Sequence, residues 1–222
     1  MKTIIKFILN KISRIKYFLT PIEFRDKFKL MKRLEDDLLN NTIENFREHF
    51  KKSVLFSDTY WSTNSIVKIR EYAIKKSLLN DEKKEHYYLE FGTFEGITAN
   101  FFSNYLKKLY TFDSFEGLRE DWGGIPTQFV GTSGEMGSFD LKKKIPNLKS
   151  NIVPIVGWVQ DTLENFLKDH NPKINFVHLD LDTYDSTKFV LERVKPYLVK
   201  NAIIIFDELY NYIGWENGEY KA

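Results

Sequence analysis

Acidic or amide side chains end five hydrophobic stretches of the chain, each of which is a predicted strand. These residues are Glu90, Asp113, Gln160, Asp180 with Asp182, and Asp207 with Glu208. In an open parallel sheet, the carboxyl ends of the strands meet in one crevice, where ligands bind. The spacing therefore predicts that these side chains converge on one site. For any single acid, the capping of a following helix is an equally good interpretation.

A glycine turn follows the first of these strands. Gly92 and Gly96 let the backbone pass close beneath a ligand, and the helix that follows points free N–H groups toward it. The second strand ends at Asp113, 21 residues after Gly92. A strand, a glycine turn, a helix and a strand ending in an acid form a βαβ unit of nucleotide-binding type, in which the acid would bind the ribose hydroxyls.

Strands alternate with helices over the rest of the chain. Strands are predicted at 88–91, 109–112, 152–156, 174–179 and 202–206, and helices at 66–79, 97–107, 162–168 and 186–194. This alternation predicts an α/β fold, a Rossmann-like parallel sheet with helices on both faces. The glycine-rich segment 114–144 is predicted to be a lid or a binding loop, with disorder as the alternative.

Composition limits the function classes. The 222 residues contain no cysteine, which excludes disulfides, thiolate metal sites and a cysteine nucleophile, and suits a cytoplasmic protein. A net charge of +2 gives no indication of nucleic-acid binding.

The N-terminal part of the chain is rich in basic residues. We expect residues 1–60 to form a helical, basic extension of a ligand-binding domain at 61–222. Residues 1–33 hold ten Lys or Arg and two acidic residues, and isoleucines recur at helical spacing over the first twenty. This pattern predicts a basic amphipathic helix that packs on the domain or on a second subunit, or that makes a peripheral membrane contact.

Together, these motifs resemble a known family. Its signature is carried by Glu90-x-Gly92-x-x-x-Gly96, Phe112–Leu118, Gly157–Leu163, His178–Thr187 and Phe206–Glu208. Over roughly 66–222 the chain resembles the class I S-adenosylmethionine-dependent methyltransferases, and most closely the macrocin O-methyltransferase-like group, which acts on sugars. The resemblance implies O-methylation of a sugar or glycan-precursor hydroxyl.

The resemblance also implies roles for individual residues. The S-adenosylmethionine site would comprise Glu90, Gly92 and Gly96 around the methionine part, Asp113 on the ribose, and Val159 with Gln160 at the adenine. Asp180, Asp207 and Glu208 resemble metal-binding acids and would suit Mg²⁺, although relatives commonly carry Asp or Asn where Glu208 stands. Asp182 matches the position of a catalytic base. The alternative for the acidic group is helix capping and hydrogen bonds to substrate hydroxyls.

Other residues carry weaker indications. We interpret His178 as a core histidine, since it lies within the fourth strand. The aromatic residues Trp61, Tyr210, Tyr212 and Trp215 would either line an acceptor pocket or pack in the core.

The C-terminal part departs from the family. In the family, a helix and a β-hairpin follow the fifth strand, whereas fifteen residues follow Asp207 here. The sequence therefore predicts a sheet that lacks these elements, an exposed fifth strand, and self-association into a homo-oligomer. A non-catalytic remnant or interaction module is the alternative function. A nicotinamide dehydrogenase is disfavoured because Gly-x-Gly-x-x-Gly is absent.

Overall fold

A computed structural model gives the fold, and it describes residues 40, 44, 63–83, 85–121, 136–209 and 215–222. The predicted extension at 1–60 lies outside the described residues, apart from positions 40 and 44. Its amphipathic helix therefore stays a prediction, as do the roles of Trp61, Tyr210 and Tyr212. None of the described helices is long and apolar enough to cross a membrane.

The core of the domain is a five-stranded sheet in the order β3-β2-β1-β4-β5. All neighbouring strands are parallel. The strands are β1 (Tyr87–Phe91), β2 (Leu109–Asp113), β3 (Ile152–Val156), β4 (Ile174–Leu179) and β5 (Leu198–Phe206). The chain moves outward from β1 to β2 and β3, then crosses back to β4 on the other side. The order thus reverses beside β1, which is the place where an open α/β sheet binds its ligand.

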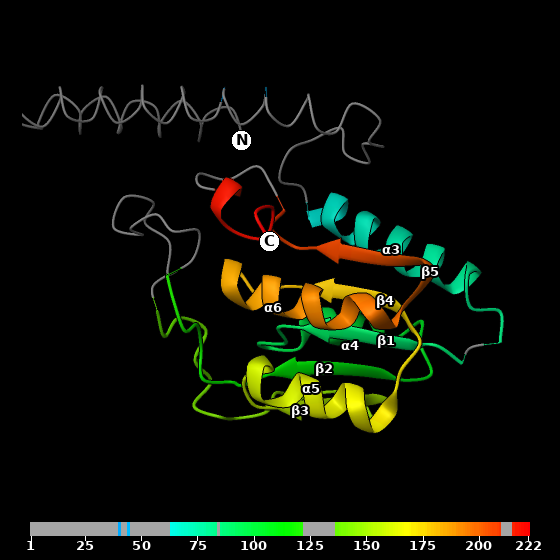
Figure 1. Ribbon diagram of the computed structural model, residues 1–222, viewed down its shortest axis with the longest axis horizontal. Helices are drawn as coiled ribbons and strands as arrows, with labels where there is room; N and C mark the ends of the chain where they lie inside the picture. The colour runs from blue at the N-terminus through cyan, green and yellow to red at the C-terminus, as the bar shows by residue number, and fades with distance from the viewer. Residues whose placement is uncertain (1–39, 41–43, 45–62, 84, 122–135, 210–214) are drawn as a thin grey trace, which may run out of the picture. The chain divides into compact units, whose positions relative to one another are not determined.

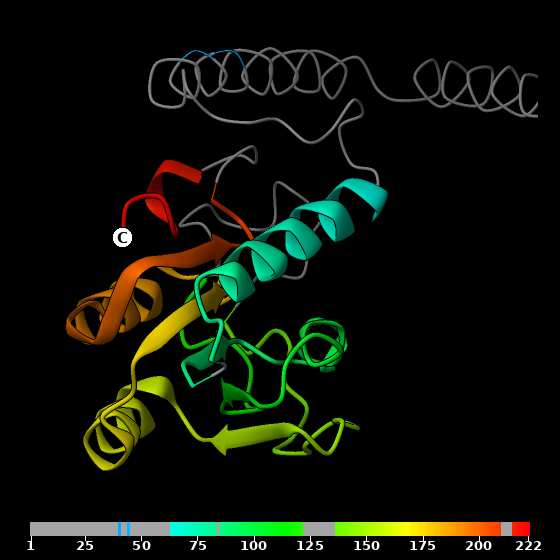
Figure 2. The ribbon, with the colours of Figure 1, turned by 90° about the vertical axis from the view of Figure 1, so that its right-hand side faces the viewer.

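Helices cover both faces of this sheet, as predicted. They are α3 (Thr63–Leu79), α4 (Ile97–Phe102), α5 (Val159–His170) and α6 (Tyr184–Val194), with short 3₁₀ turns η3 (Lys195–Tyr197) and η4 (Trp215–Asn217). Helices α5 and α6 lie on one face, and α3 and α4 lie on the other (Figures 1 and 2). The Rossmann-like fold is therefore confirmed.

Each face has its own hydrophobic core. On the α5 and α6 side, the rings of Phe91 and Phe112 stack at 4.7 Å, and Phe166 meets Phe112 edge-on at 5.1 Å. On the α3 and α4 side, Phe102 of α4 meets Phe176 of β4 at 5.0 Å. Strand β4 is buried along its whole length, which explains its continuous run of apolar residues.

Helix α4 ends at Phe102, five residues before the predicted end at 107. The carbonyl oxygens of Ser103 and Leu106 accept hydrogen bonds from the Asn151 side-chain amide, both at 2.9 Å. These carbonyls are thus satisfied from outside the helix, and the backbone continues in turns. The end of α4 depends on a residue far along the chain, so helical periodicity could not predict it.

The face of α3 that packs in the core is narrow. Ala73 and Ile74 are buried, but the side chains of Ile69 and Tyr72 are 39% and 48% exposed. Beside α3, β5 is an edge strand of the sheet formed by the described residues, in agreement with the prediction for the fifth strand. Trp215 is fully buried and its ring meets that of Tyr220 at 4.4 Å, so this tryptophan packs in the interior.

Candidate active site

A cavity of about 230 Å³ lies at the carboxyl ends of the strands. Seven of the ten predicted site residues line it, namely Gly92, Asp113, Val159, Gln160, Asp180, Asp182 and Glu208. The predicted convergence of the strand ends is therefore observed. Glu90, Gly96 and Asp207 are not among the lining residues.

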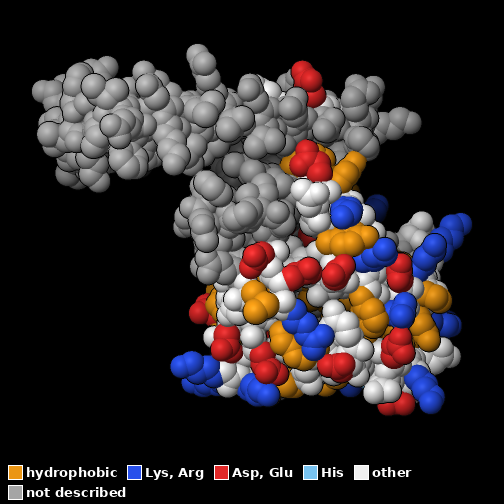
Figure 3. Space-filling view, turned by 60° about the vertical axis from the view of Figure 1, so that its left-hand side comes forward, with side chains coloured by type: hydrophobic (Ala, Val, Ile, Leu, Met, Phe, Trp, Pro, Cys, Tyr) orange, Lys and Arg blue, Asp and Glu red, His pale blue; other side chains and the backbone are white. Residues whose placement is uncertain are grey.

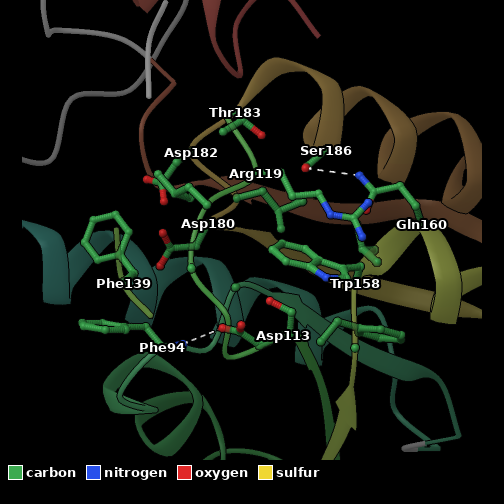
Figure 4. Close-up of a pocket in the computed structure, with 18 of the residues that line it drawn as sticks. Phe94, Asp113, Arg119, Phe139, Trp158, Gln160, Asp180, Asp182, Thr183 and Ser186 are labelled. Carbon is green, nitrogen blue, oxygen red and sulfur yellow. Dashed lines mark hydrogen bonds between the residues drawn. The ribbon is translucent and has the colours of Figure 1, made fainter. Parts of the chain in front are cut away.

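The pocket has two chemically different ends (Figure 4). Gln160, Trp158 and Arg119 gather at one end, which we call the amide end. Asp180 and Asp182 lie toward the other, the acidic end, on the side where Phe94 and Phe139 stand. Asp113 lies between the two. A ligand with a polar base and a reactive group apart from it would span this arrangement.

Asp113 organises the loops around the pocket. Its Oδ2 accepts hydrogen bonds from the backbone N–H groups of Thr93 and Phe94, both at 2.8 Å, and its Oδ1 accepts one from the Phe115 N–H at 2.7 Å. An ionised carboxylate offers about four acceptor positions, so it can accept a ligand hydroxyl as well. Asp113 thus shapes the glycine turn and still faces the pocket.

Gly92 allows two strand ends to come together. Its φ is +89°, and a Cβ at this position would lie 1.7 Å from the carbonyl oxygen of Asp180. The Asp180 N–H in turn donates to the Phe91 carbonyl at 2.9 Å. Gly96, with φ +76°, begins α4 and supports the same turn from outside the pocket. Only glycine fits at position 92.

The amide end has an acceptor that is buried without a partner. Gln160 Nε2 donates to Ser186 Oγ at 3.4 Å, while Gln160 Oε1 is buried and makes no hydrogen bond. Beside it, the Arg119 guanidinium stands 4.0 Å above the centre of the Trp158 ring. A buried carbonyl oxygen is stabilised by a ligand donor, and the amino group of an adenine is such a donor. These residues fit the nucleoside part of S-adenosylmethionine.

A second set of charged side chains lies beneath the pocket. His178 is fully buried, with Nδ1 3.2 Å from Glu90 Oε1 and Nε2 3.4 Å from Asp207 Oδ1. Arg70 of α3 forms an ion pair with the same Asp207 oxygen. Glu90 Oε2 also accepts a hydrogen bond from the Thr111 hydroxyl at 2.9 Å. We call Arg70, Asp207, His178 and Glu90 the buried ion-pair network.

The buried ion-pair network places two basic side chains, Arg70 and His178, beside two acidic ones, Asp207 and Glu90. Burial alone would lower the pKa of His178, but its hydrogen bonds with Asp207 and Glu90 outweigh burial and raise it to about 9. Burial would raise the pKa of Asp207, but His178 and Arg70 hold it below its usual range. His178 is thus a core histidine, as predicted, and a charged one. Glu90 supports the site from below, and its direct contact with a cofactor stays a prediction.

At the acidic end, three carboxyl groups come together with less compensation, since only the charge of His178 lowers the pKa of Asp180. Carboxylate oxygens of Asp180, Asp182 and Glu208 lie within 4.8 Å of one another. Burial raises the pKa of all three, and neighbouring carboxylates raise it further, to about 7 for Asp182. Within the described chain, no lysine or arginine forms an ion pair with them. We call Asp180, Asp182 and Glu208 the acidic triad.

The acidic triad shares Asp180 and Glu208 with the predicted metal set. Ligand atoms of His178, Asp180 and Asp207 form a second group within 4.8 Å of one another, so the metal role of Asp207 stays a prediction. Asp207 is also paired with Arg70 and His178. Glu208 Oε2 is buried and has no hydrogen-bond partner. Several buried oxygen atoms with too little positive charge around them suit a divalent cation such as Mg²⁺. The triad therefore fits the predicted ion.

Asp182 is held in an unusual backbone conformation. Its φ is +61°, and the Thr183 N–H donates to the Leu181 carbonyl at 2.6 Å, which closes a three-residue turn around it. Such γ-turns are rare and strained, and strain of this kind clusters at functional sites. The turn presents the Asp182 carboxyl to the pocket.

Several lining residues were not predicted from the sequence as site residues. Phe94 and Phe139 meet edge-on at 5.2 Å and are 39% and 38% exposed. Phe139 and Arg119 both belong to the segment predicted as a lid, so the glycine-rich composition was the signal available for them. Residues 122–135 lie outside the described chain, and closure of the lid stays a prediction.

On the face shown in Figure 3, the acidic and basic side chains of the described residues are interspersed with hydrophobic ones.

Comparisons with known proteins found solved structures of similar fold. The sequence search of curated proteins gave no match. The structure of CalS11, a calicheamicin methyltransferase, is similar with a TM-score of 0.53 and 19% identity, over 91% of this chain and 84% of that one. An apo structure of CalS11, described as a TDP-rhamnose 3'-O-methyltransferase, gives a TM-score of 0.49 with 21% identity over 89% of this chain and 84% of that one. The O-methyltransferase NovP gives 0.46 with 16% identity, over 64% of each chain.

The sequence itself identifies the family. A family model described as a methyltransferase domain matches residues 89–209, which is more than half of the chain. This match spans the glycine turn, the amide end and the acidic triad, and it confirms the resemblance read from the motifs. The chain therefore belongs to the methyltransferase domain family.

Proposed function

We propose that this S-adenosylmethionine-dependent methyltransferase methylates a hydroxyl of a sugar or glycan precursor, with the help of a divalent cation. The observation that carries the proposal is the acidic triad, which lies in the same pocket as the amide end and on the far side of Asp113. A cofactor whose adenosine is bound by Gln160 and Asp113 would extend its methyl group toward the triad.

The chemistry required of the chain is modest. The methyl group of a sulfonium is already activated, so the site has to align an acceptor oxygen and remove its proton. The C–O bond forms as the C–S bond breaks. The electron pair of the C–S bond stays on sulfur, and the hydroxyl proton passes to Asp182. Asp182 lines the pocket beside Asp180 and Glu208, and in the ion-free protein burial and the charges of Asp207 and Asp113 raise its pKa to about 7.

Asp180 and Glu208 would hold the cation beside Asp182. A divalent cation lowers the pKa of an alcohol and orients it. The carboxyl groups of Asp180 and Glu208 lie close to that of Asp182, so ion and base would act on one hydroxyl. Bound positive charge would also relieve the repulsion within the triad.

The acceptor class is supported by the aromatic residues at the acidic end. The partly exposed rings of Phe94 and Phe139 line the pocket and offer apolar faces on which sugar rings pack well. The sugar assignment also follows from the resemblance of the motifs to sugar O-methyltransferases.

Calorimetry followed by a transfer assay tests the proposal. We expect the full chain to bind S-adenosylmethionine, and to form S-adenosylhomocysteine when nucleotide sugars are added as acceptors with Mg²⁺. Mass spectrometry of the product identifies the methylated atom. Failure to bind the cofactor would contradict the proposal, and binding without transfer to any acceptor would favour a non-catalytic remnant. Full activity in EDTA would remove the cation from the mechanism.

Three further expectations stay predictions. They are a cytoplasmic location, a peripheral membrane contact through the N-terminal helix, and assembly into a homo-oligomer.

A further inference from the structure

A fourth buried carboxyl group lies behind the acidic triad. Glu219 belongs to the segment 215–222, and only 1% of its surface is exposed. Its Oε2 accepts a hydrogen bond from the backbone N–H of Glu208 at 3.1 Å. Glu219 is absent from the pocket lining, whereas Glu208 lines it. Glu219 therefore acts on the pocket through Glu208.

The segment 215–222, which carries this carboxyl group, packs against the rest of the domain. Trp215 is fully buried against the Tyr220 ring, and the Lys221 ammonium stands 4.3 Å above the centre of the Tyr184 ring. Tyr184 begins α6, two residues after Asp182. The segment thus contacts the chain at the end of β5 through Glu208 and next to Asp182 through Tyr184.

The unpaired oxygen atoms point to a ligand at this place. Glu219 Oε1 and Glu208 Oε2 are both buried and both lack a hydrogen-bond partner. Two buried carboxylate oxygens without partners are costly in the absence of positive charge or a donor.

We propose that Glu219 is a positioning residue for the divalent cation of the acidic triad. Its hydrogen bond fixes the backbone at Glu208, and so directs the Glu208 carboxyl group toward the ion. This inference rests on the proposed function, since that function places a cation at Asp180 and Glu208. It makes the segment 215–222 a working part of the active site.

Two substitutions separate the geometric role of Glu219 from its charge. Glu219→Ala removes both the acceptor and the charge, while Glu219→Gln keeps an oxygen that can accept the Glu208 N–H. Glu216→Gln, in the same segment, is the matched control. Mn²⁺ binding to the full chain is measured by calorimetry without any acceptor, alongside S-adenosylmethionine binding and thermal unfolding.

We expect Glu219→Ala to weaken Mn²⁺ binding by about 10–100-fold, as loss of a group that orients a metal ligand does. Glu219→Gln should weaken it less, and Glu216→Gln should leave it unchanged. S-adenosylmethionine affinity should stay the same in all three, because Glu219 does not line the pocket. If Glu219→Ala fails to fold, the Mn²⁺ affinity of Glu219→Gln is compared with that of the wild type, since a smaller loss of affinity is expected in that variant as well.

The proposal is overturned if Glu219→Ala binds Mn²⁺ as the wild type does, if both Glu219 variants fold and bind it equally, or if the wild type binds none. Failure of the proposed function looks different. A chain that binds Mn²⁺ in a manner dependent on Glu219, and yet methylates no acceptor, would keep this inference and lose the proposed function. Transfer without any bound metal would do the reverse.

Discussion

At the scale of single residues, the carboxyl groups of the site fall into two sets. Glu90 and Asp207 are neutralised by His178 and Arg70, within hydrogen-bonding reach. Among the described residues, no Lys or Arg forms an ion pair with the acidic triad, and only the His178 charge partly offsets the raised pKa of Asp180. The first set holds the sheet and α3 together beneath the pocket, and the second keeps charge available for a ligand. Buried charge that is not neutralised by the chain marks a functional site.

Asp182 and Asp113 should separate catalysis from binding. Asp182→Asn removes the base, so transfer should fall by about 10²–10⁴-fold while cofactor affinity is kept. Asp113→Ala should weaken cofactor binding, because Asp113 lines the pocket and holds the glycine turn. Calorimetry and turnover, measured on each variant, check both.

Asp185→Asn is the control, since Asp185 is exposed in the first turn of α6. Equal loss of binding in the Asp113 and Asp182 variants would contradict the role of Asp182.

Gln160 offers a test of the amide end. Gln160→Leu removes a buried oxygen that has no partner in the protein, together with the long 3.4 Å hydrogen bond to Ser186 Oγ, so thermal stability should change little. Cofactor affinity should nevertheless decrease about tenfold, the value of one hydrogen bond of about 1.4 kcal/mol. Unfolding curves and calorimetry give the two readouts. Unchanged affinity would show that the adenine does not bind at this amide.

At the scale of elements, the site depends on how closely the turns after β1 and β4 approach. The missing side chain of Gly92 lets the Asp180 carbonyl lie against it, and the tight turn at Asp182 follows two residues later. Asp113 at the end of β2 ties the glycine turn to the sheet. The pocket is thus built by three strand ends that fix one another.

Two glycine substitutions test this close approach. Gly92 and Gly137 have nearly the same φ, +89° and +87°, but a Cβ at Gly137 would meet nothing within 4 Å. Gly137→Ala should cost about 1 kcal/mol in unfolding free energy, the cost of a left-handed backbone. Gly92→Ala should cost about 3 kcal/mol or more and abolish cofactor binding, because β1 and β4 must separate. Chemical denaturation measures both, and equal losses would show that strain alone explains Gly92.

At the scale of the whole molecule, the site couples stability to pH. Five groups of the site have folded-state pKa values above their usual ones: Asp180 and Glu208, Asp182 at about 7, Glu219 at about 8 and His178 at about 9. Each contributes stability that is present in full below its unfolded pKa and is lost as the pH rises through its folded pKa. All of these groups therefore lower the stability of the protein as the pH rises. Asp207, with its lowered pKa, acts in the opposite direction only under acidic conditions.

The metal-free protein should therefore lose stability as the pH rises from about 5 to about 9. Thermal unfolding in EDTA measures this loss, with each kcal/mol corresponding to about 2–4 °C in a domain of this size. Mg²⁺ should raise the unfolding temperature more at the alkaline end, where protons no longer compete for the triad. A flat profile in EDTA would contradict the charge assignment of these buried groups.

Much of this protein follows from its sequence alone. Hydrophobic runs and their polar ends predicted the strands, and the parallel alternation of strands and helices placed Asp113, Gln160, Asp180 and Asp182 in one pocket. Strand pattern is local, and parallel strands always bring their carboxyl ends to one edge, so both could be predicted. The methyltransferase resemblance rested on these same positions.

Only the tertiary structure decided which acids work together. Asp207 was predicted beside Glu208 as a metal ligand, and the structure also pairs it with Arg70, 137 residues away in the chain, in the buried ion-pair network. Glu219, which no motif marked, lies behind Glu208 because the segment 215–222 packs at the end of β5. Sequence spacing fixes which strand end carries an acid. The charge on that acid depends on the burial and on the partners that packing supplies, and packing joins residues without regard to their separation.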